Sequence, residues 1–224
     1  MTQPASMPEL PAAFRLIAED RIDSTNAAAR RLAGEGAPDN TLVWAREQTG
    51  GRGRRGRVWA SPRGNLYVSV LCRPGGDTVS AGNLGFAAAL ALAEAVEPEL
   101  PAGVRTALKW PNDLLVDGRK VAGILLESVA DPDGNLDAVI LGIGLNIARA
   151  PADAAYPAGT LVDSGARDGV DPADVLAALA PRFLTWRETW RARGFSPLRE
   201  AWLRRAKGMG EPITVRLPQD TLHG

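Results

Sequence analysis

The segment 50–57, Gly-Gly-Arg-Gly-Arg-Arg-Gly-Arg, brings four arginines together on a stretch of chain that glycine leaves flexible. Arginine binds phosphate through two parallel hydrogen bonds, and glycine allows backbone N–H groups to approach an anion closely. The segment therefore indicates a loop for a small phosphorylated ligand. A solvated loop and an RGG-like nucleic-acid contact remain open as alternatives.

Three of these glycines, Gly51, Gly53 and Gly56, also satisfy the G-x-G-x-x-G pattern of dinucleotide-binding loops, and Asp77 follows downstream. That pattern binds a dinucleotide only where it opens a helix. Here Val58-Trp59 and a second turn follow instead, so the sequence excludes a dinucleotide fold.

A second cluster, Lys109-Trp110-Pro111-Asn112-Asp113, lies at the predicted end of a strand. Downstream, Asp117-Gly118 predicts a two-residue hairpin in which Leu115 pairs with Lys120 and Asp113 pairs with Ala122. Asp113 and Lys120 then share one face of the sheet, within reach of each other. An ordinary ion pair and a functional pair both fit this geometry.

Lysine is rare in this chain, which favours the functional interpretation. Arginine supplies 23 of the 26 basic residues, and the three lysines are Lys109, Lys120 and Lys207. Lysine presents a compact charge where arginine presents a planar fork, so each remaining lysine invites a specific explanation.

Two further segments carry small polar groups. Asp23-Ser24-Thr25-Asn26 is typical of a helix N-terminus, or it points at a neutral hydrogen-bonding ligand. Gly142-Ile143-Gly144-Leu145-Asn146 places two glycines in a strand, which marks a close approach of ligand or backbone, or a strand bend in the core. Asn146 could read a nucleobase edge. Trp59 is either a core residue or a ring that stacks on a base.

Composition excludes several classes of protein. Acidic and basic residues balance at 26 each, so no overall charge attracts nucleic acid or membrane. One cysteine and one histidine cannot form a disulfide framework, a Cys/His zinc site or a histidine-based triad. The polar N-terminus shows no signal peptide, and the apolar segment 84–96 is too short to span a bilayer. We therefore expect a soluble protein of a reducing compartment.

The elements that must position these residues form an α+β pattern. Helices are predicted at 27–33, 80–97, 171–193 and 197–206, and strands at 14–18, 41–46, 65–71, 104–110, 114–116, 119–127, 136–147 and 211–217. We predict a mixed, mainly antiparallel central sheet flanked by helices over 14–206, preceded by a flexible arm over 1–13. The strand at 211–217 has no visible partner.

Taken together, these segments resemble the biotin–protein ligase (holocarboxylase synthetase) family. The matching pieces fall in the family's order over about residues 14–206. They are Asp23-Ser24-Thr25-Asn26, Gln48, Gly51 to Arg57, Trp59, Lys109 to Asp113, Lys120-Val121-Ala122-Gly123-Ile124-Leu125 and Gly142 to Asn146.

The resemblance implies the class II synthetase-like catalytic domain of biotin and lipoate ligases. It also implies a two-step reaction: biotin and MgATP give biotinyl-5′-AMP and pyrophosphate, and the adenylate then acylates one lysine of a biotin carboxyl carrier protein domain. The carrier would belong to acetyl-CoA carboxylase or another biotin-dependent carboxylase. The expected enzyme is cytoplasmic, without a nucleic-acid or membrane partner, and a homodimer is compatible with it.

The resemblance further implies the roles of individual residues. Those implied to be catalytic are Lys120 and Arg52. Those implied to bind biotin are Ser24, Thr25, Asn26, Gln48, Arg52, Gly53, Arg54 and Lys120. Those implied to bind the nucleotide are Arg54, Arg55, Trp59, Lys109, Asn112 and Asn146. For Mg²⁺ the candidate ligand is Asp113, with the phosphates as the main alternative source of ligands.

Two departures from the family shape the expected domain organisation. Some members carry an N-terminal winged-helix DNA-binding domain, for which the 13 residues before the core leave no room, so we expect no repressor role. Members also carry a small C-terminal β-barrel-like domain, of which 207–224 would be a truncated start. Competing functions are a ligase for lipoate or another acyl acid on the same fold, and a non-enzymatic nucleic-acid-binding module.

Overall fold

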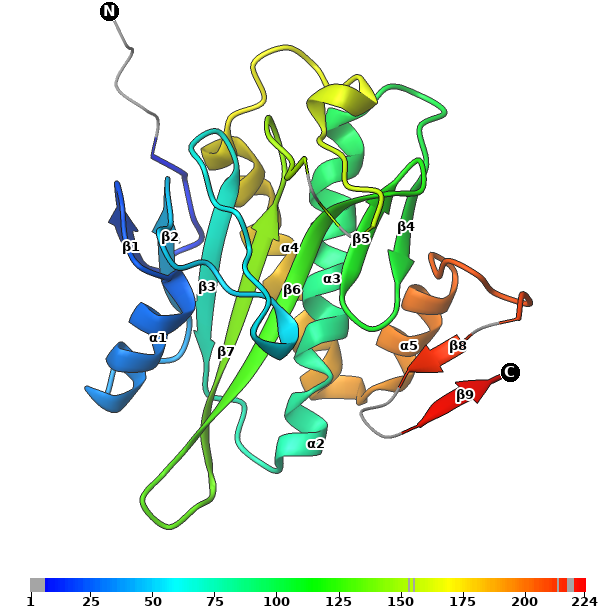
Figure 1. Cartoon of the computed structure of the whole chain (residues 1–224). Coiled ribbons are helices and arrows are strands. Elements are labelled where there is room, and N and C mark those ends of the chain that lie inside the picture. The colour runs from blue at the N-terminus through cyan, green and yellow to red at the C-terminus, as the bar shows by residue number, and fades with distance from the viewer. Residues whose placement is uncertain (1–6, 153, 155, 213, 217–219) are drawn as a thin grey trace, which may run out of the picture.

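The computed structural model describes residues 7–152, 154, 156–212, 214–216 and 220–224. A seven-stranded sheet has the strand order β1-β2-β3-β7-β6-β5-β4, in which β1 is parallel to β2 and every other pair is antiparallel (Figure 1). Its strands are β1 (Arg15–Glu19), β2 (Thr41–Ala45), β3 (Leu66–Cys72), β4 (Thr106–Lys109), β5 (Asp113–Val116), β6 (Arg119–Ala130) and β7 (Leu136–Leu145). The predicted α+β fold with a mixed, mainly antiparallel sheet is confirmed.

Five α-helices and three 3₁₀ turns accompany this sheet in the described part of the chain. The helices are α1 (Thr25–Gly34), α2 (Thr78–Ala81), α3 (Leu84–Val96), α4 (Pro172–Arg193) and α5 (Ser196–Leu203). The 3₁₀ turns are η1 (Arg54–Gly56), η2 (Glu97–Glu99) and η3 (Val162–Ser164). A separate hairpin of β8 (Thr214–Arg216) and β9 (Thr221–His223) follows α5.

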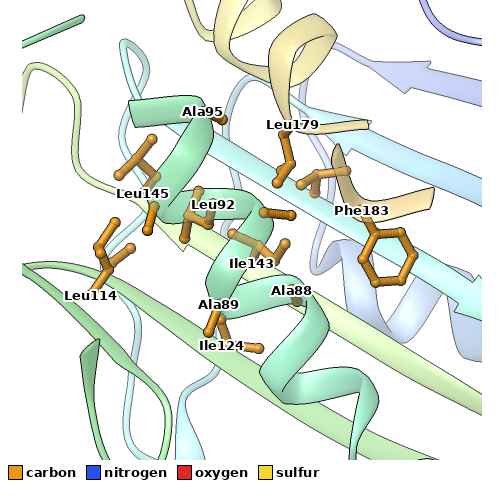
Figure 2. Close-up of a cluster of buried hydrophobic side chains, with 14 of the residues drawn as sticks. Ala88, Ala89, Leu92, Ala95, Leu114, Ile124, Ile143, Leu145, Leu179 and Phe183 are labelled. Carbon is orange, nitrogen blue, oxygen red and sulfur yellow. The ribbon is translucent and has the colours of Figure 1, made fainter. Parts of the chain in front are cut away.

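The alternation of side chains along the strands divides the sheet into two chemically different faces. One set of alternate residues, which includes Val68, Leu141 and Ile143, packs against α3 and α4 in the main core. Figure 2 shows Leu92 of α3 near Ile143 and Leu145 of β7, with Phe183 of α4 in the same cluster. The opposite face carries α1 over a small apolar cluster and, further along the strands, polar side chains and glycines.

The apolar helix in the middle of the chain owes its composition to burial. The helical stretch Thr78–Glu99 spans 22 residues and is long and apolar enough by composition to cross a membrane, but 61% of an 18-residue window within it is buried in the fold. Our expectation from 84–96 alone was a helix too short for that. The alanines of α3 bring its backbone close to both the sheet and α4, as expected for the central helix of a core.

The predicted local signals are confirmed where polar side chains define helix ends and turns. Ser24 precedes α1 in an extended conformation and accepts a hydrogen bond from the Ala27 amide, at 3.4 Å. Asp171 accepts from the Ala173 amide ahead of Pro172 at the start of α4. Asp117 and Gly118 both have positive φ, as a two-residue hairpin turn requires.

The predicted register of the β5–β6 hairpin is wrong by one residue beyond its turn. Leu115 pairs with Lys120 as predicted, but a bulge follows and Asp113 pairs with Gly123, not with Ala122. The backbone groups of Lys120 and Val121 are hydrogen-bonded instead to Pro157, Gly159 and Asn146. This third segment holds the bulge in place.

Both ends of the chain also differ from expectation. Within the arm predicted over 1–13, residues 1–6 lie outside the described residues, but Leu10 packs against the core. The strand predicted at 211–217 does have a partner, because Thr214 pairs with His223 across the β8–β9 hairpin. Residues 213 and 217 lie outside the described residues. The division into domains at 13 and 206 stays a prediction.

A buried arginine connects α4 to the loop that precedes β2. The Arg187 side chain is 2% exposed and binds both carboxylate oxygens of Asp39, at 2.7 and 2.8 Å. It also donates to Asn40. Asp39 accepts in addition from the backbone amide of Arg73 at the end of β3. One carboxylate therefore joins α4, β2 and β3, and its loss would leave a buried charge without its partner.

We expect Asp39→Asn to lower the free energy of unfolding by about 2 kcal/mol, because the Arg187 charge stays buried with a weaker acceptor. Urea unfolding checks this. The matched control is Arg191→Gln: Arg191 is half-exposed and lies 3.6 Å from the same carboxylate, so its loss should cost below about 1 kcal/mol. Equal effects of the two substitutions would contradict the special role of the buried pair.

Candidate active site

Three glycines leave the sheet bare on the face opposite α3 and α4. Gly142 and Gly144 lie on β7, where Gly142 pairs with Ser69 of β3 and Gly144 pairs with Gly123 of β6. A Cβ at Gly142 would lie 2.1 Å from Asn26 Oδ1, and one at Gly144 would lie 2.4 Å from Trp59 Nε1. The glycines of the Gly142-to-Asn146 motif thus admit two polar side chains onto the sheet surface.

The start of α1 supplies the first of these groups. Thr25 and Asn26 are buried, and Ser69 Oγ lies 2.7 Å from Thr25 Oγ1 and 2.6 Å from Asn26 Oδ1. Gln48 Oε1 accepts from the Thr25 amide at 2.8 Å and lies 3.0 Å from Thr25 Oγ1. Capping explains Ser24 alone, so Thr25, Asn26 and Gln48 form a polar network that the helix itself does not need.

Trp59 covers the next pair of glycines. Its indole lies against Gly144. It also lies against Gly123, where an added Cβ would be 3.1 Å from a carbon of the ring. Its Nε1 is buried and has no hydrogen-bond partner among the described residues. Trp59 therefore lies on the polar face and not in the helix-covered core, and its stacking on a base stays a prediction.

Lys120 lies beside this ring in a partly enclosed position. Its Nζ is 2.6 Å from Asp113 Oδ1, 5.4 Å from the centroid of Trp59 and 4.8 Å from that of Tyr156. The predicted proximity of Asp113 and Lys120 is confirmed despite the shifted register. Burial, followed by the Asp113 charge, raises the pKa of Tyr156 above its ordinary value. The ammonium is thus held between two π faces and one carboxylate.

The arginine-rich loop is fixed at its two ends and exposed between them. Trp59 N donates to Gly51 O at 2.9 Å, and a Cβ at Gly51 would lie 2.4 Å from Trp59 O, so only glycine fits there. Gly53 N donates to Arg57 O at 2.7 Å. The four arginines are exposed, and Arg54 donates to Asn112 Oδ1 at 3.3 Å. Arg52 makes no side-chain hydrogen bond or ion pair within the described ranges.

One sheet face thus carries a neutral hydrogen-bonding network and a lysine, with exposed arginines on the adjoining loop. Comparison with known proteins identifies the family in which this combination occurs. Residues 18–146 match the model of the biotin/lipoate A/B protein ligase family. The chain belongs to this family.

Relatives in this ligase family extend over most of the chain. The biotin–[acetyl-CoA-carboxylase] ligase of Paracoccus denitrificans is 46% identical over 208 residues, which are 91% of this chain and 86% of that protein. The ligase of the same name from Mycobacterium tuberculosis is 38% identical, over 87% of this chain and 72% of that protein. The bifunctional ligase/repressor BirA of Bacillus subtilis is 35% identical, and the match covers 65% of its length.

Solved structures agree with the sequence relatives. A biotin protein ligase from Aquifex aeolicus, in complex with biotin and ATP, has a TM-score of 0.77 at 29% identity and matches 93% of this chain and 85% of that chain. The Leishmania major enzyme in complex with biotinyl-5-AMP has a TM-score of 0.73 at 28% identity, over 92% of this chain and 86% of that chain. The fold of this ligase-family chain is therefore the fold of the catalytic domains of those enzymes.

The remaining predicted residues lie near this face, and the side-chain amides of Asn146 and Asn112 donate to the backbone of neighbouring segments. Asn146 is buried and donates to Gly159 O at 3.2 Å, so its amide holds the segment that pairs with Lys120. Asn112 donates to Ile124 O at 2.7 Å and joins β6 to the end of β4. Lys109, at that end, is exposed and pairs with Asp113 along the backbone. Arg55 is exposed in η1 and has a positive φ.

Four residues near the polar face of the sheet were not predicted from the sequence: Ser61, Ser69, Glu127 and Tyr156. Ser69 had a signal, because it is the one serine inside the apolar run of β3. Glu127 had one too, because it lies two and four residues from Leu125 and Gly123 and so shares their face. Tyr156 had none, since only the folded chain brings it to Lys120.

We expect Gly144→Ala to displace Trp59 and to lower the free energy of unfolding by about 1–3 kcal/mol, because the added methyl collides with the indole. Urea unfolding measures the loss. The emission of Trp59, obtained by subtracting the spectrum of the matching Trp59→Phe variant, reports exposure of the ring. Gly34→Ala is the matched control: a Cβ there meets nothing within 4 Å at the end of α1, so stability should stay or rise. Unchanged stability and emission for Gly144→Ala would contradict the contact.

Proposed function

We propose that this chain is an ATP-dependent biotin–protein ligase. It activates biotin to biotinyl-5′-AMP with release of pyrophosphate, and it transfers biotin to a lysine of a biotin carboxyl carrier protein domain. The observation that carries this proposal is the Lys120 ammonium, enclosed by Trp59 and Tyr156 on the same sheet face as the neutral network of Thr25 and Asn26. Relatives named as biotin ligases and structures with biotin, ATP and biotinyl-5-AMP support it.

The chemistry of the first step explains why a cation stands there. The carboxylate of biotin attacks the α-phosphate of ATP, forms a mixed anhydride and expels pyrophosphate, so two anions must approach each other. Lys120 can lower that repulsion in a partly enclosed site, and we assign Arg52 the same task on the exposed loop. In the second step the acceptor lysine attacks the anhydride carbonyl and AMP leaves. Neither step requires a cysteine or histidine nucleophile.

We assign the neutral head of biotin to the network around Thr25. Ser24, Thr25, Asn26 and Gln48 carry no charge and present oxygens and amides, which suits a neutral ring that both donates and accepts. The assignment of Gly53 and Arg54 to biotin rests on their place in the loop beside this network. A loop that closes over the adenylate would also protect it from water.

For the nucleotide we propose Trp59 as the stacking surface, with Arg54, Arg55, Lys109 and Asn112 near the phosphates. The Trp59 ring packs on the sheet at Gly144, and the arginines of the loop that precedes it are exposed. Asn146 is proposed near the adenine, although its amide already donates to Gly159 O.

Magnesium enters this proposal with ATP as its substrate complex. Asp113, the one candidate ligand, faces the Lys120 ammonium at 2.6 Å. No group of three or more His, Cys, Asp or Glu side chains suited to a metal occurs in the part of the chain that the structure describes. The described residues therefore do not form a resident metal site, and we propose that the phosphates supply most of the ligands.

We further propose a cytoplasmic enzyme whose macromolecular partner is the carrier domain alone, with neither nucleic acid nor membrane. The balanced charge of the chain supports the absence of a nucleic-acid partner. A homodimer is compatible with this proposal. The test is incubation with biotin, MgATP and a biotin carboxyl carrier domain, followed by mass spectrometry. One biotin added to one acceptor lysine supports the function, and a gain from lipoate instead would favour the other branch of the family.

We expect Lys120→Ala to lower biotin-dependent ATP–pyrophosphate exchange by about 10²–10³-fold, because the developing charge loses its cation. Biotin binding should weaken less, since the network of neutral groups remains. Calorimetry with biotin separates the two effects. Lys207→Ala serves as the control, because Lys207 is exposed and lies after α5. Exchange at the wild-type rate in Lys120→Ala would overturn the assignment.

A further inference from the structure

Glu127 of β6 contacts the proposed biotin network at Asn26 and has no role in the reaction described above. Its Oε2 accepts from Asn26 Nδ2 at 2.7 Å, across 101 residues of sequence. Its other oxygen lies 3.6 Å from Arg30 NH2, one turn further along α1. The side chain is 33% exposed, so it stands at the edge of the network and not within it.

This carboxylate fixes the orientation of the Asn26 amide. An ionised carboxylate can only accept, so Asn26 must turn its NH₂ group to Glu127 and its oxygen to Ser69. The other end of the network is fixed in the same way. The Thr25 backbone amide can only donate, so Gln48 must turn its oxygen to Thr25. Gln48 Nε2 then donates to Ser61 Oγ at 2.9 Å.

Between these two fixed ends the network is one hydrogen short. Three oxygen–oxygen contacts occur: Asn26 Oδ1 to Ser69 at 2.6 Å, Ser69 to Thr25 at 2.7 Å, and Thr25 to Gln48 Oε1 at 3.0 Å. Only the hydroxyls of Ser69 and Thr25 carry hydrogens, one each. Two hydrogens cannot bridge three contacts, so in one contact two oxygens face each other with no hydrogen between them. Such a pair is unfavourable until a donor from outside reaches it.

We infer that Glu127 is a positioning residue that sets this polarity and thereby gives the site an unsatisfied acceptor for an N–H group of the ligand. The inference rests on the proposed function, in which the ligand is biotin with its two ureido N–H groups. The 3.0 Å contact is the longest of the three, so Thr25 Oγ1 and Gln48 Oε1 are the acceptors that stay open. The protein's own groups leave one contact of the network without a hydrogen, and a ligand that donates an N–H completes it.

Glu127→Gln tests the inference, because the new amide can donate as well as accept. Asn26 can then turn over and donate to Ser69, Ser69 can donate to Thr25, and Thr25 can donate to Gln48, which satisfies every contact without ligand. We expect the dissociation constant of biotin to rise about tenfold, the effect of one hydrogen bond. The apparent KM for ATP should stay within about twofold, and the Tm should not fall.

Arg30→Gln is the matched control. It removes the positive partner of the Arg30–Glu127 ion pair but leaves the carboxylate that orients Asn26. Biotin affinity should stay within about twofold of wild type in this variant. If Glu127 served only to tie α1 to β6, both substitutions would lower the Tm and raise the constants for biotin and ATP together. Unchanged biotin affinity in Glu127→Gln, or equal losses in both variants, would overturn the inference.

Failure of the proposed function gives a different result. A wild-type chain that neither binds biotin nor exchanges pyrophosphate refutes the biotin assignment whatever the variants do. The polarity argument still predicts that Glu127→Gln unfolds at a Tm at least as high as that of Arg30→Gln. A lower Tm for Glu127→Gln would contradict the claim that the network lacks one hydrogen.

Discussion

The bare strip of sheet at Gly123, Gly142 and Gly144 is the constraint on which the other features of this site depend. Side chains at these positions would occupy the space that Asn26 and Trp59 fill. Because side chains alternate along a strand, the same strands can bury Leu141 and Ile143 under α3 and α4 on the other face. The sheet is thus a rigid core on one side and a platform for polar groups on the other. The proposed function uses the platform, and the core supplies most of the buried apolar contacts.

The two polar regions of the platform differ in charge, and the fold keeps them apart. The region around Thr25 and Ser69 is neutral and almost fully buried, where an unpaired charge would be costly. The Lys120 region is partly open and contains the opposite charge of Asp113 at 2.6 Å. An ion pair that is less than fully buried can exchange its partner when an anionic ligand arrives, since water compensates part of the lost interaction. A neutral network cannot do so, and it selects its ligand by the direction of its hydrogens.

Sequence predicted the strands and the caps well, because those depend on local rules. Ser24 and Asp171 cap helices for reasons contained in the adjacent residues, and Asp117-Gly118 forms a turn that few other pairs can form. The bulge in β6 could not be predicted, because its cause is the distant segment at Pro157 and Gly159. Contacts between segments far apart in the chain leave no pattern in the local sequence of the strand that they distort.

The same distinction applies to the site residues. Lys120 was singled out because lysine is rare in this chain, Thr25 because it lies in a polar cluster at a helix start, and Gln48 only through the family resemblance. Glu127 and Tyr156 were missed, since a glutamate in a strand and a tyrosine in a loop are unremarked until the fold places them beside Asn26 and Lys120. The loop arginines were predicted as ligands of a phosphate from their composition, with a solvated loop and a nucleic-acid contact as alternatives, and the structure leaves their side chains exposed.

The spacing of the two regions restricts what can bind both. Gly142, under the neutral network, and Gly144, under Trp59, are two residues apart on β7, which separates them by about 7 Å along the strand. A ligand that reaches both regions must therefore carry a neutral hydrogen-bonding head and an anionic end separated by at least that length of apolar chain. Biotin, with a ureido ring at one end and a carboxylate at the end of a four-methylene arm, meets this requirement. A compact acid does not, because its carboxylate would fall within the network of uncharged side chains and could not reach Lys120.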